Sequence, residues 1–119
     1  MPSSTFHHEH IKAQLQREIG WTIKNRVRDP RVPEIVTVTG IKLASDLRNA
    51  TVYVSVYGDE KIRTGALVAL NRAAPFVQRT VSRRISIRHF PKLIFRLDDS
   101  VDRSLHIAEL LREVQDDLV

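Results

Sequence analysis

The pattern of apolar and polar positions begins with a helix. Between residues 10 and 28, apolar side chains recur at every fourth position: Ile11, Leu15, Ile19, Ile23 and Val27. Residues four apart lie one above the other on a helix, so this spacing predicts an amphipathic helix with one buried face. Pro30 should end it, because proline drives the preceding residue, Asp29, out of the helical region. Residues 1–8 carry no such pattern and are predicted to be disordered.

Alternating apolar and polar side chains then predict strands. In residues 35–44, Val36 and Val38 are the first apolar positions, but the phase changes after Gly40. A glycine at such a phase change predicts a β-bulge. Residues 50–57 alternate without interruption, and the turn residues 45–49 lie between the two segments. Together they predict an antiparallel hairpin, and a further alternating segment, residues 92–97, predicts a third strand.

A second helical pattern covers residues 62–88 and contains a proline. Apolar residues line one side of this pattern, and arginines line the other: Arg72, Arg79, Arg83, Arg84 and Arg88. Proline lacks the amide hydrogen needed inside a helix and disfavours helical geometry at the residue before it. We therefore predict that Ala74 ends one helix and that Pro75 begins the next. Phe76 lies near the arginine side, but we favour a core position for it over a stacking surface for RNA.

The last amphipathic pattern, in residues 101–117, predicts a C-terminal helix with acidic residues on its outer side. The order of elements is then helix, strand, strand, helix, kink, helix, strand, helix. Three strands with every helix on one face would form a two-layer α+β sandwich. The 119 residues contain no linker and no repeat, so we expect a single domain over residues 1–119.

Charge is distributed unevenly along the chain, whose formal net charge is +5. Residues 61–97 contain nine Lys and Arg and no acid, whereas residues 98–119 contain two basic and seven acidic residues. Such a basic block indicates a surface for a polyanion, and the alternative is a pattern that only aids solubility. Trp21, on the polar face of the first helix, could stack on a base. We prefer the alternative that it packs beneath the N-terminal segment and arginine side chains.

Signals of catalysis are weak. The chain has no cysteine, and His7, His8 and His10 lack a carboxylate or cysteine cluster nearby, so we expect no metal site. There is no phosphate-binding loop, dinucleotide motif or nucleophile elbow. No apolar run approaches the ~20 residues that span a bilayer, and the N-terminus lacks the features of a secretory signal. We expect a cytoplasmic protein that is not an enzyme and that needs neither cofactor nor membrane.

The order of elements resembles the type II KH domain, in which a GxxG loop between two helices clamps the RNA backbone. In this chain Ala73, Ala74 and Pro75 stand in place of that loop. A KH-like chain without GxxG resembles the ribosome-binding factor A family, which has glycine where this chain has Pro75. Further segments resemble family motifs in the same order: Asp29-Pro30-Arg31, Val36-Thr37-Val38-Thr39-Gly40, Ser45-Asp46-Leu47, Ala50-Thr51-Val52-Tyr53-Val54, Ala69-Leu70-Asn71-Arg72-Ala73, and Arg84-Ile85-Ser86-Ile87-Arg88 with Pro91.

This resemblance implies a non-catalytic, monomeric assembly factor linked to growth in the cold. Such a factor binds the immature small (30S) ribosomal subunit and supports late 16S rRNA maturation and 5′-end processing, and a ribosome-associated GTPase promotes its release. The candidate RNA-binding residues are the arginines beside the kink, with two secondary candidates near the end of the first helix: Arg72, Arg79, Arg83, Arg84, Arg88, Arg28 and Arg31. The alternatives are a generic KH-type single-stranded RNA-binding protein and a DNA-binding helix-turn-helix protein.

Overall fold

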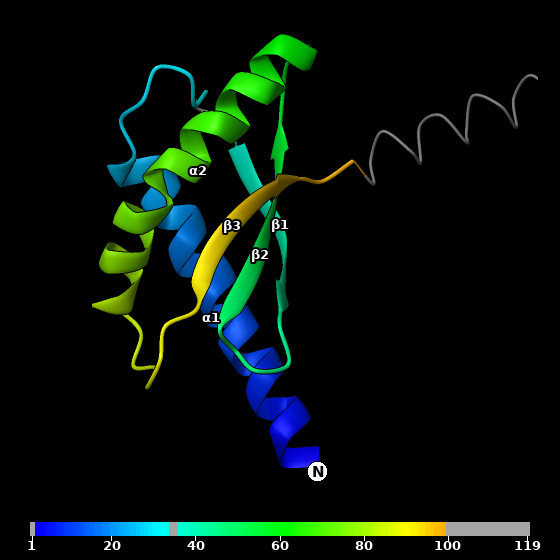
Figure 1. Ribbon diagram of the computed structural model, residues 1–119, viewed down its shortest axis with the longest axis vertical. Coiled ribbons are helices and arrows are strands. Elements are labelled where there is room, and N and C mark those ends of the chain that lie inside the picture. Colours follow the sequence, from blue (N-terminus) through cyan, green and yellow to red (C-terminus); the bar gives the residue numbers. More distant parts are fainter. Residues whose placement is uncertain (1, 34–35, 100–119) are drawn as a thin grey trace, which may run out of the picture.

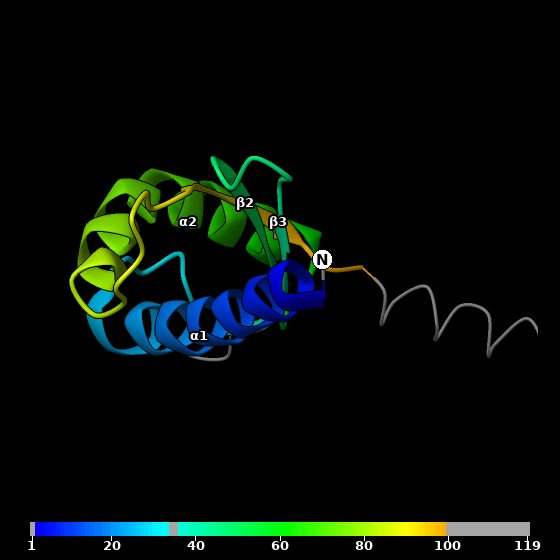
Figure 2. The same cartoon turned by 90° about the horizontal axis from the view of Figure 1, so that it is seen from below.

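The computed structural model describes residues 2–33 and 36–99. In order along the chain, the elements are α1 (Pro2–Arg26), β1 (Val36–Leu43), β2 (Asn49–Val56), α2 (Glu60–Ser82) and β3 (Lys92–Leu97). Both helices lie on the same face of the sheet (Figures 1 and 2). This arrangement confirms the α+β, KH-like fold class. The helix predicted over residues 101–117 lies outside the described residues.

The sheet is mixed, with β2 as its central strand. β1 pairs with β2 in antiparallel fashion, and β3 pairs with β2 in parallel fashion. Parallel neighbours need a crossover connection, which α2 provides. Val38 pairs with Val54 but Gly40 pairs with Tyr53, so Thr39 is the extra residue of a bulge. The predicted bulge is therefore confirmed, and it explains why Ile41 and Leu43 pack against the same core as Val38.

The core lies between the helices and the inner face of the sheet. The five apolar positions predicted to form a helical stripe include four buried residues, Ile11, Leu15, Ile19 and Ile23. They pack in one cluster with alternate residues of the strands and the inner face of α2. Burial of each large aliphatic side chain stabilises the fold by about 1.5–3 kcal/mol. This shared core holds both helices to the sheet.

α1 begins at Pro2, earlier than the predicted start at His10, and the prediction that residues 1–8 lie outside the helix is wrong. Proline is tolerated in the first turn of a helix, and neither proline nor glycine follows until Gly20. The helix ends at Arg26. The backbone N–H of Val27 then donates to the carbonyl of Thr22 at 3.2 Å, which closes the last turn ahead of Pro30.

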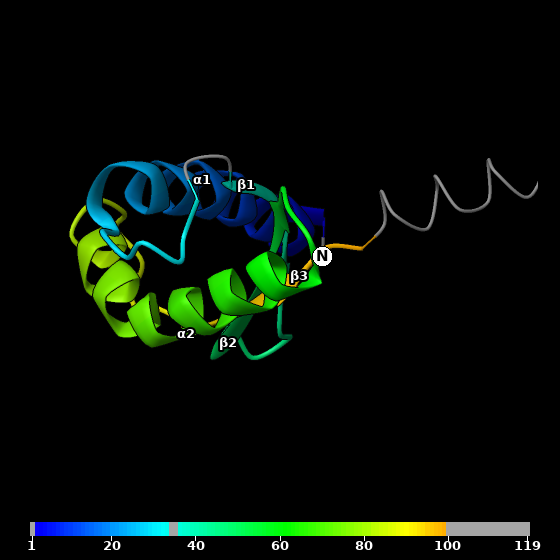
Figure 3. The same cartoon turned by 90° about the horizontal axis from the view of Figure 1, so that it is seen from above.

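α2 is one helix, and the prediction of two helices broken at Pro75 is wrong. The helix runs from Glu60 to Ser82 with Pro75 inside it, and it bends along its length (Figures 1 and 3). Asn71, before the proline, donates from Nδ2 to the carbonyl of Phe95 at 3.1 Å and accepts at Oδ1 from the Phe95 N–H at 2.8 Å. Gln78, after it, accepts from the backbone N–H of Leu93 at 3.2 Å.

These hydrogen bonds explain why the helix continues. Asn71 and Gln78 lie on opposite sides of Pro75 and both bind the outer edge of β3, so the two parts of α2 are fixed against one strand. Proline removes one backbone hydrogen bond and crowds the preceding turn. A bend relieves that crowding without ending the helix. The same contacts cover the free edge of β3, which would otherwise be open to pairing with another chain.

Candidate nucleic-acid interface

The outward face of α2 carries an exposed stripe of three arginines and an aromatic ring. We call Arg72, Phe76, Arg79 and Arg83 the α2 stripe; all four are exposed. Their spacings of four, three and four residues place them on one side of a helix. Arg83 is the C-cap and keeps helical backbone angles, with φ −79° and ψ −17°. Three of the predicted RNA-binding arginines are thus brought together.

Phe76 is exposed, and the expectation of a core position for this residue is wrong. Its side chain is 40% exposed, and the neighbouring Val77 is buried instead. A break at Pro75 would have left the facing of Phe76 undefined, whereas a continuous helix places it between Arg72 and Arg79. An aromatic ring among cations is suited to single-stranded nucleic acid, because the ring stacks on bases while the cations neutralise phosphates.

The kink motif lies inside α2, beside the stripe. Ala73 is half-buried and packs against the core, Ala74 is buried, and Pro75 is exposed. Proline and two alanines leave only small side chains at this part of the helix. The α2 stripe therefore flanks the bend on both sides, with Arg72 before it and Phe76 and Arg79 after it.

The loop after α1 contains an ion pair between Arg31 and Asp29. Arg31 forms a two-pronged ion pair with Asp29, with Nη2 2.9 Å from Oδ2 and Nε 3.2 Å from Oδ1. The pKa of Asp29 falls from its usual 3.8 to about 2, first through the Arg31 side-chain hydrogen bonds and then through the Arg31 backbone N–H. The charge of Arg72 lowers this pKa as well, by less than the Arg31 contacts do. Arg31 is therefore engaged with Asp29, while Arg28 is exposed in the same segment.

Arg84 connects the end of α2 to α1 and is not part of the stripe. Its Nε donates to Glu18 Oε2 at 2.5 Å, and its Cζ lies 4.4 Å from the centroid of the Trp21 ring. Arg26 Cζ lies 5.8 Å from the same centroid. Arginine groups thus lie over Trp21, as expected, and the residue stays 38% exposed. The expectation that the N-terminal segment covers Trp21 is wrong, because residues 2–8 continue the same helix α1 away from it. The prediction that Arg84 lies in a helix is wrong, because α2 ends at Ser82.

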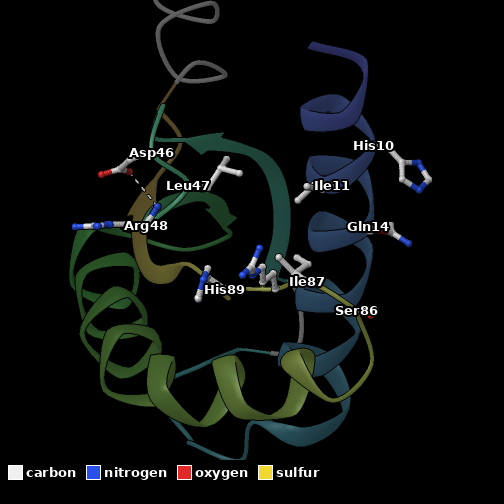
Figure 4. Close-up of a pocket in the computed structure, with 10 residues that line it drawn as sticks. His10, Ile11, Gln14, Asp46, Leu47, Arg48, Ser86, Ile87 and His89 are labelled. Carbon is white, nitrogen blue, oxygen red and sulfur yellow. Dashed lines mark hydrogen bonds between the residues drawn. The ribbon is translucent and has the colours of Figure 1, made fainter. Parts of the chain in front are cut away.

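Arg88 also follows α2, and it lines a separate pocket of about 890 Å³. The walls come from α1, the β1–β2 turn and the loop before β3: His10, Ile11, Gln14, Asp46, Leu47, Arg48, Ser86, Ile87, Arg88 and His89. Ile11, Leu47 and Ile87 lie toward its centre, whereas His10 points away (Figure 4). Arg88 was predicted to act beside the kink, but the structure places it in this pocket.

Sequence patterns could identify the stripe only in part. Helical spacing alone places Arg72, Arg79 and Arg83 on one face, but the separation of Arg84 and Arg88 from them depends on where α2 ends.

Neither α1 nor α2 combines the length and the apolar character needed to cross a membrane.

The comparisons with known proteins identify the family of this chain. A family model described as ribosome-binding factor A matches residues 7–111. Ribosome-binding factor A of Desulfitobacterium hafniense (strain DSM 10664 / DCB-2) is 45% identical over 101 residues, which is 85% of this chain and 80% of that protein. The crystal structure of ribosome-binding factor A from Thermus thermophilus superposes with a TM-score of 0.67 at 34% identity, covering 75% of this chain and 92% of that one.

A further relative is described in a complex. The Thermus thermophilus ribosome-binding factor A homology model that was fitted into the cryo-EM map of a 30S complex gives a TM-score of 0.63 at 32% identity. The similarity covers 76% of this chain and 94% of that one. The family model, the identity to a curated relative and the shared fold lead to one conclusion. The chain belongs to the ribosome-binding factor A family.

Proposed function

We propose that this protein is an assembly factor that binds the small (30S) ribosomal subunit and contacts rRNA through the α2 stripe. The observation that carries the proposal is the exposed series Arg72, Phe76, Arg79 and Arg83 on the bent helix of a chain in this family. The Thermus thermophilus relative fitted into a 30S complex supports the choice of partner.

The stripe suits a folded RNA surface. Arg79 and Arg83 would bind phosphates after the bend, and Arg72 would do so before it, because each guanidinium is exposed. Phe76 offers a ring face to an unpaired base between them. Each phosphate neutralised steepens the salt dependence of binding by roughly 0.7–0.9 in log–log slope, so the stripe as a whole should make binding strongly dependent on salt.

The finer functional assignments belong to the same proposal. The protein would act without catalysis, as a cytoplasmic monomer, in late 16S rRNA maturation and 5′-end processing. A ribosome-associated GTPase would promote its release from the subunit. Arg28, exposed near the end of α1, would add a further phosphate contact beside Arg72.

Co-sedimentation with purified 30S subunits tests the role of the stripe. The double variant Arg79→Glu, Arg83→Glu should lose co-sedimentation while it keeps a cooperative thermal melt. A matched control is Arg17→Glu, Lys61→Glu, which makes the same change in net charge at two exposed positions outside the stripe. The control should sediment as the natural protein does. Equal loss in both variants would show that net charge alone, and not the stripe, governs binding.

The exposed Phe76 also supports a second candidate, a generic single-stranded RNA-binding protein. Such a protein would bind a short RNA as tightly as it binds subunits, and a filter-binding competition between the two separates the candidates. The helix-turn-helix alternative loses its basis, because the two short helices that it requires are one continuous α2.

A further inference from the structure

The outer face of the sheet, turned away from α1 and α2, carries its own chemistry. No described helix covers this face (Figure 2). Successive side chains of a strand point to opposite faces of the sheet, so the residues that alternate with the buried ones lie on this outer face. On the central strand β2 these are Asn49, Thr51, Tyr53 and Ser55, and the three strands contain no acidic residue. The face is therefore neutral or basic throughout its strands.

The register places Tyr53, a half-buried aromatic residue, at its centre. Tyr53 of β2 pairs with Gly40 of β1 on one side and with Arg96 of β3 on the other. Gly40 has no side chain, and a Cβ built there would meet no atom within 4 Å. Gly40 therefore leaves Tyr53 without a paired side chain on the β1 side, where the bulge residue Thr39 donates from Oγ1 to the Tyr53 carbonyl at 3.3 Å. Adjacent strands lie about 4.8 Å apart, so the Arg96 side chain is a direct neighbour of Tyr53 on the β3 side.

Three cations lie on the same face as this ring, and Arg96 is the one that pairs directly with Tyr53. Lys42 pairs with Thr51, which pairs in turn with Ile94, and Lys92 pairs with Asn49. Lys42, Lys92 and Arg96 are all exposed, and none of them forms a salt bridge with any residue that the structure describes. Asp98, which follows β3, accepts a hydrogen bond at Oδ2 from Thr39 Oγ1 at 2.5 Å. The cations are therefore available to a partner from outside.

We propose that this face is a second RNA-binding surface, on which an unpaired base stacks on Tyr53 and the flanking phosphates bind Lys42, Lys92 and Arg96. Single-stranded RNA combines planar rings with regularly spaced negative charge, and sheets that bind it present aromatic rings among basic side chains. An acidic protein would satisfy the cations but would leave the Tyr53 ring without a stacked base. The α2 stripe lies on the other layer of the molecule, so the protein would hold two RNA segments at once.

Fluorescence anisotropy with a labelled, mixed-sequence, 12-nucleotide single-stranded RNA tests this surface. The measurement uses the full chain with Arg79→Gln and Arg83→Gln, so that the outer face is read without the stripe. Stacking on one aromatic side chain is worth about 1–3 kcal/mol, so adding Tyr53→Ala should weaken binding roughly 5-fold or more. Tyr53→Phe keeps the ring and should bind within about twofold of its parent. Equal affinity of the alanine and phenylalanine variants would overturn the proposal.

Two further measurements test the role of the cations and distinguish an RNA partner from a protein partner. Lys42→Gln with Arg96→Gln should lower affinity and the salt slope more than the control Arg17→Gln with Lys61→Gln, which removes the same charge at exposed positions off the sheet. In the natural protein, RNA containing 4-thiouridine should crosslink to the β2 peptide on irradiation. This readout remains if an alanine variant fails to fold. Absence of that crosslink would overturn the proposal and favour a protein partner, and neither result depends on whether the α2 stripe binds 30S subunits.

Discussion

Arg84 lies over Trp21, with 4.4 Å between the Arg84 Cζ and the centroid of the indole ring. Trp21 belongs to α1, and Arg84 follows the end of α2. Because Arg84 also pairs with Glu18, one turn before Trp21, it ties the loop after α2 to the polar face of α1. This contact fixes the direction in which the chain leaves α2 and separates Arg84 from Arg83.

We expect Arg84→Ala to lower the free energy of unfolding by about 1 kcal/mol, because it removes a partly exposed ion pair and a cation–π contact. Trp21 is the single tryptophan of the chain, so its emission spectrum should shift in the folded state. Urea unfolding followed by tryptophan fluorescence measures both effects. Arg88→Ala serves as the control and should leave the emission unchanged; an identical shift in both variants would contradict the assigned contact.

The Asp29 carboxyl should titrate at a pKa of about 2 in the folded protein. A depressed folded pKa means that Asp29 contributes stability above its ordinary pKa of 3.8 and that this contribution is lost as the pH falls toward 2. Arg31→Gln removes the principal cause, and the pKa should then rise toward 3.8. NMR titration of the side-chain carboxyl carbon measures the value directly. An unchanged pKa in Arg31→Gln would exclude the Arg31 pair as the cause.

Pro75→Ala should raise the free energy of unfolding by about 1–3 kcal/mol, since alanine restores a backbone hydrogen bond and removes the crowding of the preceding turn. Pro75→Gly should also keep the fold, with a gain about 1 kcal/mol smaller because glycine is the poorer helix former. Thermal melts of the two variants compare them. If the bend sets the position of Arg72 relative to Arg79, Pro75→Ala will also weaken binding to 30S subunits at unchanged charge. Loss of a cooperative melt in either variant would mean that proline is required locally.

Substitution by alanine should change the free energy of unfolding in opposite directions at two glycines, Gly58 and Gly65. Gly58 has φ +145°, and a Cβ there would lie 2.7 Å from Ile62 Cγ2, so Gly58→Ala should lower the free energy of unfolding by about 1–3 kcal/mol. Gly65 lies inside α2, and a Cβ there would meet nothing within 4 Å. Gly65→Ala should therefore raise stability by up to about 1 kcal/mol through helix propensity alone. Chemical unfolding of both variants, at constant m-value, checks the pair.

The local patterns of the sequence predicted most of the fold. The four-residue spacing from Ile11 to Ile23 identified the buried face of α1, and the phase change at Gly40 identified the bulge. The strand over residues 92–97 was predicted with the bounds that β3 has. These features are readable because helical and strand periods are properties of neighbouring residues, and a buried face must repeat at the same period.

The tertiary structure decided what happens where a local preference meets a long-range contact. Pro75 favours a break, yet Asn71 and Gln78 hold both parts of α2 against β3, and the helix continues. That continuity turns Phe76 outward between Arg72 and Arg79.

The partners of the charged residues were likewise beyond the reach of the sequence. Glu18 and Arg84 meet across 66 positions of the chain, and helical spacing says nothing about such a distance. By itself, then, the sequence determined which side of each element is apolar, because that is set by neighbours a few residues away. Only the packing of α2 onto β3 and α1 decided which arginines stay exposed together, because it brings residues distant in the chain into contact.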